Sequence, residues 1–539
     1  MRQISVELRN PYVPWSTARN SRHRAWARGY AFRGAQLLEA TDLAKDLATV
    51  DLAARDAPAT FFARYASALN GSFALVLRTS DGLWAMTDSL RSIPLFYGIR
   101  DGSFLLADDA ETVRSFLGAT NLDGVASTEF LLTGYVTGTE TLYPGVLQVQ
   151  ASELIQASSS AAEGVQRHRY FRFFHHDHFG ESLDELIGKM DAVALDVFRR
   201  LLESAKGRRI VIPLSGGYDS RMIATMLRRL GYDNVLCFAY GARNSWEPTI
   251  SEEVSRRLGF PWRFEPWTRR MWREWYRGDE RKKYTRYGGN YVSNAFVADW
   301  PLVGKMLRGG ILKEEDVLVP GHSGDFLGGS HLPTSFLAEP QPLLEDVVDA
   351  VLRRHYSLWD WRGRNPDLAR RIRIRVRDRM EPEALPAGED VTSAFEKWDW
   401  QERQSKFIVN SVRAYEYWGL DWRVPLWDHA LMDFFLRVPL SLRVQKKLYD
   451  GYTERSLFPR FGVSGLERRI TFLSVAYAWA FGPKTPWDPR LGRYRAADFI
   501  EAWRRYGIRF GGRLRNRKAL YDPIALGAAV SLHASEDRD

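Results

Sequence analysis

The chain has 539 residues, of which 45% are hydrophobic and 26% are charged. This composition excludes a disordered or fibrous protein, and the length predicts two to four domains with a sizeable core in each. The formal charge of +10 arises from 76 basic and 66 acidic residues, and the arginines are dispersed through helical segments. We therefore expect no nucleic-acid partner, and a positive cleft that suits a phosphate-rich substrate.

Cysteine content and hydropathy indicate the compartment. The single cysteine, Cys237, lies in an apolar run that predicts a buried strand residue, and it excludes a disulfide framework. No apolar stretch reaches membrane-spanning length, and charged residues interrupt the N-terminus. We expect a cytoplasmic protein with no membrane partner. The sequence leaves the oligomeric state open, a homodimer included.

The first 172 residues predict an α+β domain. Residues 72–78 and 83–87 alternate as short strands around a Ser-Asp-Gly turn, which indicates a hairpin. Residues 37–48 and 128–132 carry helical patterning. This mixture predicts a β-rich layer flanked by helices.

A parallel α/β unit follows. An amphipathic helix over 182–202 leads into an apolar strand at 210–213, and a Ser-Gly-Gly-x-Asp-Ser turn then precedes a helix over 221–230. Residues 235–240 supply the next apolar strand. Strand, loop, helix and strand in this order predict neighbouring parallel strands.

The Ser-Gly-Gly-x-Asp-Ser turn predicts a pyrophosphate cradle. After Leu214, Gly216 and Gly217 let successive backbone N–H groups point at an anion, and the following helix directs its positive end there. Ser215 and Ser220 add hydroxyl donors. The spacing matches neither the Walker A pattern nor the Gly-x-Gly-x-x-Gly dinucleotide fingerprint. It resembles the PP-loop of enzymes that cleave ATP between its α and β phosphates.

A second glycine-rich turn, 321–330, follows an apolar strand at 317–320. Taken alone, it is a structural loop. Two such turns on parallel strands would meet at the carboxyl edge of one sheet, where open α/β folds place ligands. Asp219 and Asp325 could then hold Mg²⁺ against the triphosphate, with Gly321 beside them.

Two further segments complete a pattern of four motifs. Gly-Leu-Asp-Trp-Arg-Val-Pro-Leu-Trp-Asp spans 419–428, and a Lys-Lys-Leu-Tyr segment begins at Lys446. In this order the motifs resemble those of the asparagine synthetase superfamily. The resemblance implies an Ntn-hydrolase-like glutaminase domain at 1–172 and a synthetase domain at 173–480. The latter would be an α/β PP-loop domain of the adenine nucleotide alpha hydrolase type with a helical C-terminal part, and 481–539 a helical extension.

The glutaminase half departs from the family pattern. Leu-Asn-Gly-Ser-Phe at 69–73 and Asp-Ser-Leu-Arg-Ser-Ile-Pro-Leu-Phe-Tyr at 88–97 match family motifs. Glutamine-using members, however, carry a nucleophilic cysteine directly after the initiator methionine, where this chain has Arg2. The resemblance is therefore to members with a degenerate glutaminase, such as the β-lactam synthetases, and nitrogen would come from ammonia, an amine or a partner.

The synthetase half departs at two positions. His322 stands where asparagine synthetases have a glutamate thought to deprotonate the amine, so it is either a general base or a residue that only hydrogen-bonds the loop. Asp325-Phe326 replaces an acidic pair and leaves one carboxylate for metal. Asp421 shortens the family's glutamate, which suggests a differently shaped acceptor site.

The resemblance also implies roles for a lysine and for the second strand of the unit. Lys446 would stabilise the α-phosphate charge and the tetrahedral intermediate, with Lys447 as the alternative register. Tyr240 and Gly241 would lie against adenine. The cluster His175-His176-Asp177-His178 favours an exposed interdomain linker over a metal site.

The implied reaction is ATP-dependent amide formation with Mg²⁺. A carboxylate would attack ATP to give an acyl-adenylate and pyrophosphate, and ammonia or an amine would then displace AMP. Aspartate is the acceptor that the family name suggests. A uronic acid is a second acceptor, because similar motifs occur in proteins associated with bacterial surface polysaccharides. Intramolecular cyclisation, as in β-lactam or lasso-peptide synthetases, and a nucleotide-binding scaffold without turnover are the alternatives.

Overall fold

The computed structural model describes most of residues 3–466. Gaps within that range fall at 52–56, 159–163, 242–245, 269–270, 272–273, 276–277, 339, 358–365 and 387–389. The extension predicted for 481–539 lies outside the described residues. Among the helices of the described part, none combines the length and apolarity needed to cross a membrane.

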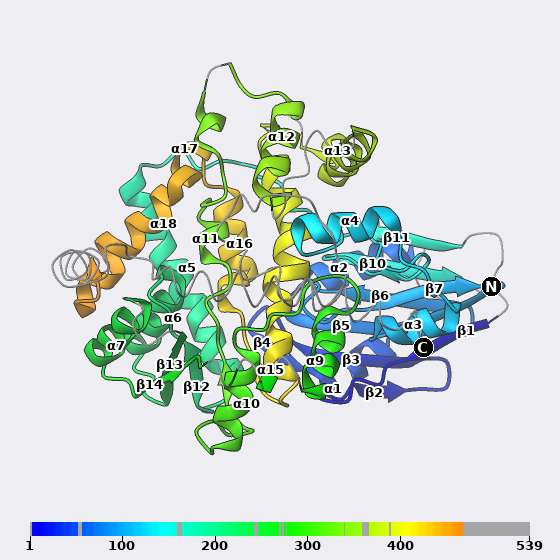
Figure 1. Ribbon diagram of the computed structural model, residues 1–539, viewed down its shortest axis with the longest axis horizontal. Coiled ribbons are helices and arrows are strands. Elements are labelled where there is room, and N and C mark those ends of the chain that lie inside the picture. The colour runs from blue at the N-terminus through cyan, green and yellow to red at the C-terminus, as the bar shows by residue number, and fades with distance from the viewer. Residues whose placement is uncertain are drawn as a thin grey trace.

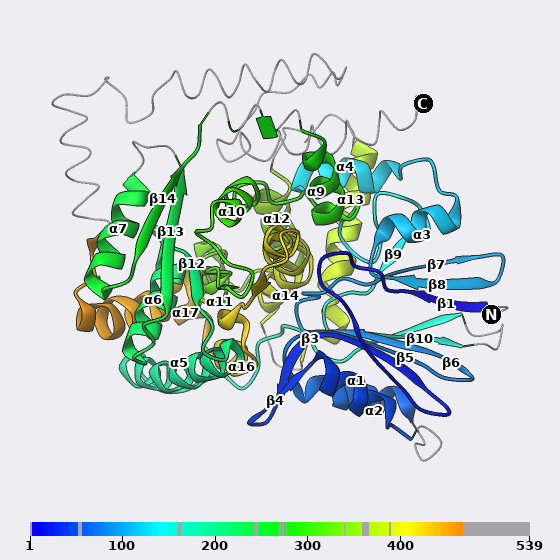
Figure 2. The same cartoon turned by 90° about the horizontal axis from the view of Figure 1, so that it is seen from below.

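The N-terminal third forms two stacked β-sheets with helices on both outer faces (Figures 1 and 2). In spatial order, the smaller sheet contains β1 (Gln3–Glu7), β8 (Ser103–Ala107), β7 (Phe96–Arg100) and β9 (Leu147–Gln148). The larger sheet contains β11 (Val165–Arg169), β10 (Glu153–Ser158), β6 (Gly82–Thr87), β5 (Leu69–Arg78), β3 (Arg24–Arg33) and β2 (Ser16–Arg19), with β4 (Gln36–Glu39) paired to β3. The helices are α1 (Ala40–Ala48), α2 (Pro58–Ser67), α3 (Ala110–Leu117) and α4 (Gly124–Thr133).

The two sheets and the two outer sets of helices form four layers, and side chains that alternate between the two faces of each strand fill the space between the layers. In β5, Leu75 and Leu77 belong to the core beneath α1 and α2, whereas Ala74 and Val76 belong to the core between the two sheets. Successive strand residues point to opposite faces, so one strand supplies both cores. Val113 of α3 packs in a third core on the outer face of the smaller sheet. The predicted α+β class and hairpin are confirmed.

A parallel five-stranded sheet forms the centre of the second domain. Its order is β14 (Trp262–Pro266), β13 (Val235–Gly241), β12 (Ile210–Pro213), β15 (Val317–Leu318) and β16 (Asp421–Trp422). The accompanying helices are α5 (Leu183–Ala205), α6 (Tyr218–Arg229), α7 (Trp246–Leu258), α9 (Asp279–Gly289) and α10 (Trp300–Arg308). Helix α5 starts at a capping box formed by Ser182 and Glu185. The parallel arrangement predicted for this unit is confirmed.

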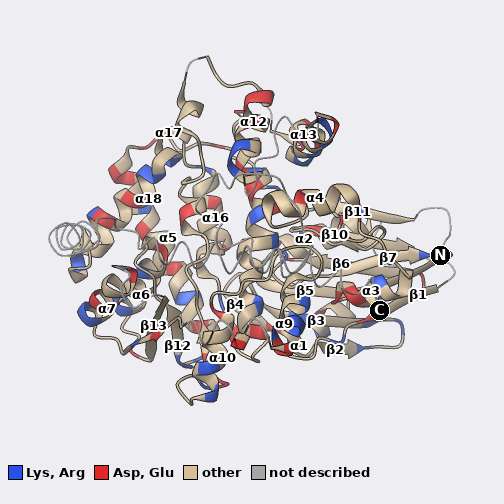
Figure 3. Cartoon of the chain, in the orientation of Figure 1, with Lys and Arg blue, Asp and Glu red and all other residues tan. Residues whose placement is uncertain are grey.

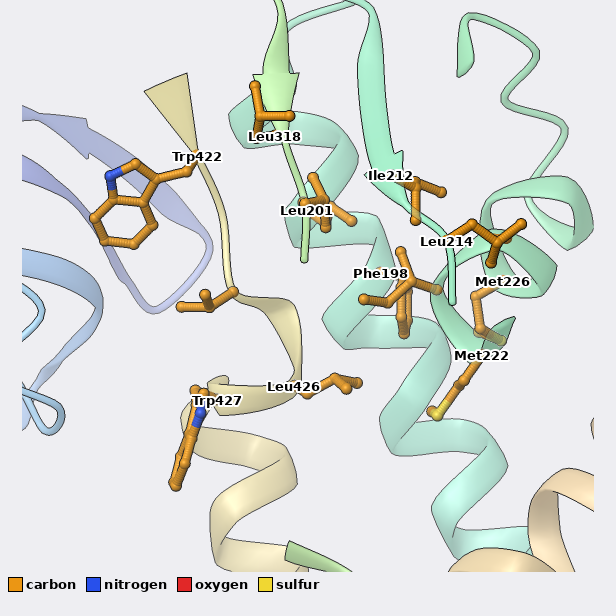
Figure 4. Packing of buried hydrophobic residues seen from close by; sticks show 14 of the residues in the cluster. Phe198, Leu201, Ile212, Leu214, Met222, Met226, Leu318, Trp422, Leu426 and Trp427 are labelled. Carbon is orange, nitrogen blue, oxygen red and sulfur yellow. The ribbon is translucent and has the colours of Figure 1, made fainter. Parts of the chain in front are cut away.

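The core beneath the sheet joins α5 to the strands and to α6 (Figure 4). Phe198 and Leu201 of α5 lie near Ile212 of β12 and Met222 of α6, and all four side chains are buried. Cys237 is buried in β13, as predicted, and burial raises the pKa of its thiol to about 12. The thiol is therefore a packing group and not a nucleophile at neutral pH.

The chain beyond residue 341 is mainly helical, as predicted. The helical elements from 324 onward are α11 (Gly324–Leu327), η1 (Thr334–Leu337), α12 (Leu344–His355), α13 (Pro366–Met380), η2 (Pro382–Ala384), α14 (Ser393–Trp398), η3 (Asp399–Ile408), η4 (Val409–Val412), α15 (Arg413–Glu416), η5 (Pro425–Trp427), α16 (His429–Leu436), α17 (Leu440–Arg443), η6 (Val444–Lys446), α18 (Lys447–Tyr452), η7 (Thr453–Leu457) and η8 (Phe458–Phe461). Acidic and basic residues occur together on α7, α12, α13 and α18 (Figure 3), in line with the dispersed charge of the sequence.

The histidine cluster between the two domains differs from the exposed linker that we expected. His175 is buried, with Nδ1 3.0 Å from the Leu436 carbonyl oxygen and Nε2 2.9 Å from Glu396. Asp177 and His178 are exposed. The segment packs against α14 and α16. Four polar residues in a row do not predict such packing from sequence. Among the described residues, no group of three or more His, Cys, Asp or Glu side chains could hold a metal ion.

A buried charge cluster joins the two domains. Glu416 of α15 lies 2.8 Å from Arg28 of β3 and is also paired with Arg413. Tyr287 donates its hydroxyl to Glu416 at 2.7 Å, and Trp422 donates its ring N–H at 2.9 Å. Burial acts to raise the pKa of the Glu416 carboxyl, but the two arginines lower it below its usual value. The carboxylate is therefore held ionised at the domain interface.

Candidate active site

The turn between β12 and α6 has a fixed shape. Leu214 donates its N–H to the Phe238 carbonyl oxygen at 2.8 Å, which joins the start of the turn to β13. Ser215 donates its N–H to the Ser220 hydroxyl at 3.1 Å, and Gly217 donates its N–H to the Ser215 hydroxyl at 3.1 Å. Gly217 also caps α6 in an extended conformation. These contacts curl the backbone around the first turn of the helix, where an anion would be favoured.

Arg221 supports this turn from below. Its side chain is fully buried and donates to the Gly216 carbonyl oxygen at 2.8 Å and to the Val463 carbonyl oxygen at 3.0 Å. Its guanidinium carbon also lies 5.3 Å from the ring centroid of Tyr218 and 5.2 Å from that of Phe458. The arginine therefore fixes the loop shape and does not serve as a ligand for phosphate.

The second glycine turn packs directly on the first, as predicted from the parallel strands. A Cβ added at Gly321 would lie 2.6 Å from the Ser220 nitrogen. One added at Gly324 would lie 2.5 Å from the Tyr449 hydroxyl and 2.9 Å from Asp219 Oδ1. Contacts under 3.0 Å exclude any larger side chain unless neighbouring atoms move. Two glycines of the second turn are thus steric requirements of the pairing.

The two predicted metal carboxylates lie at this junction. Asp219 Oδ2 accepts the backbone N–H of Asp325 at 2.9 Å, and Oδ1 accepts the Tyr449 hydroxyl at 2.8 Å. Burial and the charge of Asp325 raise the pKa of Asp219 to about 7, although both hydrogen bonds and Lys446 act to lower it. The Asp325 side chain is 50% exposed, so it faces open space.

This pair fits Mg²⁺, which takes few carboxylates when phosphate oxygens and water complete its shell. Burial and, after it, the negative charge of Asp325 raise the pKa of Asp219, so a cation between the two carboxyl groups would favour its ionised form. Phe326, which replaces the second acid, is buried between the rings of Phe173 and Trp427. The metal set available from this turn is therefore the two aspartates alone.

Of the two adjacent lysines, Lys446 faces the turn. Its Nζ lies 5.1 Å from the ring centroid of Tyr218 and 3.0 Å from Asp450 Oδ1. Its charge also acts on the pKa of Asp219. Lys447 is exposed. Of the two lysines, Lys446 is therefore the one that lies beside Tyr218, at the start of α6.

Comparison with known proteins places this site in a family. Residues 199–458 match the family model described as asparagine synthase. This part of the chain is a domain of the asparagine synthetase superfamily. The family comprises ATP-dependent amide-forming synthetases, so the protein is a synthetase of this kind.

The solved structures that are similar to this chain are distant from it both in sequence identity and in overall superposition. One is the glutamine phosphoribosylpyrophosphate amidotransferase from B. subtilis complexed with ADP and GMP, at 14% identity over 48% of this chain and 73% of that chain, with a TM-score of 0.21. Another is the allosteric regulatory enzyme of purine biosynthesis, at 13% identity over 58% of each chain, with a TM-score of 0.20. A search of curated proteins found no match.

His322 of the synthetase has a hydrogen-bond partner and is neutral. Its Nε2 lies 2.7 Å from the Ser411 hydroxyl, and burial lowers its pKa to about 4. Both interpretations of this residue survive in geometric terms. A neutral imidazole can accept a proton, but a pKa this low makes it a weak base at neutral pH.

Asp421 is not brought to this edge of the synthetase sheet. It is the first residue of β16 and lies level with Val317 and Ile210, at the amino ends of the parallel strands. The Ser-Gly-Gly-x-Asp-Ser turn at 215–220, which we call the pyrophosphate turn, begins about 10 Å further along the strands, after the last residue of β12. Asp421 accepts from Arg208 at 2.9 Å and from Arg423 at 2.7 Å, so it forms an ion pair away from the turn, whereas we expected it among the catalytic residues, at the acceptor site.

Tyr240 and Gly241 lie at the carboxyl end of β13, beside the pyrophosphate turn. The Tyr240 ring stacks on Trp267 with centroids 5.4 Å apart, and Trp267 donates its backbone N–H to the Gly241 carbonyl oxygen at 2.9 Å. Because β13 is paired with β12, these two rings lie at the strand end beside the one from which the turn starts.

The residues that match glutaminase motifs make structural contacts. Asn70 accepts the backbone N–H of His429 at 3.0 Å, at the start of α16 in the other domain. Asp88 is buried and accepts backbone N–H groups from Phe73, Leu90 and Ser92. Burial raises the pKa of the Asp88 carboxyl, although these hydrogen bonds act to lower it. The first motif therefore contacts the second domain, whereas Asp88 of the second motif stabilises the fold of its own domain.

Sequence reasoning missed three residues of the site. Tyr449 follows Lys446 by three positions, so helical spacing could have placed both near the turn. Arg221 directly follows the motif, but its burial is a tertiary property. Ser411 lies 89 residues from His322, and no local pattern connects them.

Proposed function

We propose that the protein is an ATP-dependent amide-forming ligase that activates a carboxylic acid as an acyl-adenylate. The acceptor is aspartate or a related acid such as a uronic acid, and the nitrogen donor is ammonia or an amine. The observation that carries the proposal is the junction of the two glycine turns. At this junction Asp219, Asp325 and Lys446 lie around the N-terminal end of α6.

The first step uses the pyrophosphate turn. A carboxylate oxygen of the acceptor attacks the α-phosphorus, the bond between the α-phosphorus and the bridging oxygen breaks, and pyrophosphate leaves. Backbone N–H groups of the first turn of α6, with the Ser215 and Ser220 hydroxyls, hold the leaving group at the positive end of this helix, where Gly216 and Gly217 let it approach. Asp219 and Asp325 would hold Mg²⁺, which would supply positive charge against the phosphate oxygens.

The second step forms the amide. The amine nitrogen attacks the acyl carbon, the bond to AMP breaks, and the nitrogen loses a proton. Lys446, whose Nζ lies 5.1 Å from the Tyr218 ring centroid, is proposed to stabilise the tetrahedral intermediate with its ammonium. His322 is neutral and hydrogen-bonded to Ser411, so it can accept that proton or orient the loop.

Nitrogen is proposed to come from outside the chain. The single cysteine is buried in β13 of the synthetase domain, and Asn70 of the glutaminase motif is engaged at the interface. These contacts support a scaffold role for the first domain.

Release of AMP and pyrophosphate from ATP tests the proposal. The acceptors are aspartate and a panel of uronic and amino acids, each with ammonium, with glutamine and with no added amine. The proposal expects AMP with one acid plus ammonium and no gain from glutamine. AMP without added amine would identify a cyclase, and nucleotide binding without AMP under every condition would identify a scaffold.

A further inference from the structure

Ser411 makes two short contacts through one hydroxyl group. The residue lies in the 3₁₀ helix η4, directly after the π-helix η3, and it is buried. Its Oγ lies 2.6 Å from the carbonyl oxygen of Ile408 and 2.7 Å from Nε2 of His322. Both contacts are within hydrogen-bond distance.

The number of hydrogens decides the direction of both bonds. A serine hydroxyl has one hydrogen to donate, and its oxygen can also accept. A carbonyl oxygen accepts and never donates, so Ser411 gives its hydrogen to Ile408. The contact with His322 is then a hydrogen bond only if Nε2 carries a hydrogen and donates it to the Ser411 oxygen. The three groups form a directed chain from the imidazole through the hydroxyl to the carbonyl.

This chain leaves a lone pair on the other ring nitrogen of His322. A neutral imidazole carries hydrogen on one nitrogen, so Nδ1 is unprotonated when Nε2–H is the donor. Burial lowers the pKa of His322 to about 4, although Asp325 acts to raise it, and the ring is therefore neutral at pH 7. In the part of the chain that the structure describes, Nδ1 has no hydrogen-bond partner. Nδ1 is thus an acceptor without a donor.

His322 lies on a loop that is held against the pyrophosphate turn on both sides of the histidine. Gly321 directly precedes it, and a Cβ added there would lie 2.6 Å from the Ser220 nitrogen. Three residues after it, Asp325 donates its backbone N–H to Asp219 at 2.9 Å. These two contacts fix the backbone of His322, and the bond to Ser411 fixes its ring.

We propose that Ser411 is a positioning residue that fixes His322 as the Nε2–H tautomer and so makes Nδ1 the atom that accepts a proton from the nitrogen donor. The inference rests on the proposed function for the identity of that donor. When the amine nitrogen bonds to the acyl carbon, the bond from that carbon to the AMP oxygen breaks, and AMP leaves with the electron pair. The proton lost by nitrogen passes to Nδ1, and the imidazolium then returns it to water.

Nitrogen NMR reads the tautomer without turnover. The full chain is labelled with ¹⁵N-histidine, and the signals of His322 are identified among those of the ten histidines by their loss in His322→Gln. Hydrogen on Nε2 and none on Nδ1 is the expected result. In Ser411→Ala the Nε2 hydrogen is expected to exchange with water roughly tenfold faster, because its acceptor is lost. Hydrogen on Nδ1 in the unaltered protein would overturn the inference.

Two rates separate this role from support of the loop. Exchange of labelled pyrophosphate into ATP measures acyl-adenylate formation, and amide formation measures the step that uses nitrogen. Ser411→Ala is expected to lower amide formation roughly tenfold and His322→Gln roughly a hundredfold, both with unchanged pyrophosphate exchange. Glutamine keeps a donor for the Ser411 oxygen but has no basic nitrogen. Equal losses in the two rates would show that both residues only shape the loop, and would overturn the inference.

Two further variants control for the hydroxyl itself. Ser411→Thr keeps the hydroxyl and is expected to retain most of the amide formation. Ser405→Ala removes another buried hydroxyl of the same helical segment, which donates to the Trp400 carbonyl oxygen at 2.8 Å, and should leave both rates unchanged. An equal loss of amide formation in Ser405→Ala and Ser411→Ala would contradict the inference. If no acid supports AMP release, the proposed function fails and the role of Nδ1 fails with it, whereas NMR still decides the tautomer.

Discussion

Replacing Gly321 by alanine tests whether the two glycine turns must touch. The new Cβ would lie 2.6 Å from the Ser220 nitrogen and 3.1 Å from its Cα, and ordinary contact begins near 3.4 Å. The turns must therefore separate by roughly 0.8 Å. Both atoms in the way are backbone, so no rotamer change relieves the clash. Overpacking of this kind costs about 1–3 kcal/mol.

If the cradle binds pyrophosphate only in its present shape, that cost appears in nucleotide affinity. We expect the Kd for Mg-ATP to rise roughly tenfold to a hundredfold. The assay is calorimetric titration of α,β-methylene-ATP, with urea denaturation to confirm folding. Gly188→Ala is the matched control, because its Cβ meets nothing within 4 Å on helix α5. Unchanged affinity in Gly321→Ala would refute the steric argument.

Three further changes have defined outcomes. Lys446→Ala should lower kcat roughly a hundredfold or more while nucleotide still binds, because its cation acts on the transition state, and the exposed Lys447 changed to alanine should leave kcat unaltered. Glu416→Gln leaves two buried arginines without their carboxylate and should lower the free energy of unfolding by about 3–5 kcal/mol in urea; a loss below 1 kcal/mol, as for exposed pairs, would contradict it. Burial acts to raise the pKa of Glu381, but Lys397 and Arg169 lower it to about 2 from its usual 4.5. The ionised carboxylate therefore stabilises the fold fully above about pH 4.5 and loses this effect as the pH falls toward about 2, so Glu381→Gln should flatten the acid limb of a stability profile.

Local pattern predicted the elements that position the pyrophosphate turn. The apolar run of β12, the paired glycines and the amphipathic α6 each follow from residues within one short window, and the parallel strand order follows from their sequence. The meeting of Asp219 with Asp325 followed from the same rule, because the carboxyl ends of parallel strands share an edge.

Tertiary register and packing limited the rest. Strand β16 has two residues, so the pattern around Asp421 could not show which end of the sheet it occupies. His175 is buried by helices whose positions depend on residues more than 200 positions away.

Transfer of oxygen from the acceptor to AMP tests the central claim most directly. The acceptor that supports AMP release is prepared with ¹⁸O in its reacting carboxylate and turned over with ATP and ammonium. Attack on the α-phosphorus predicts one ¹⁸O atom in AMP and none in pyrophosphate. Label in inorganic phosphate together with ADP would show attack on the γ-phosphorus and would contradict the acyl-adenylate account.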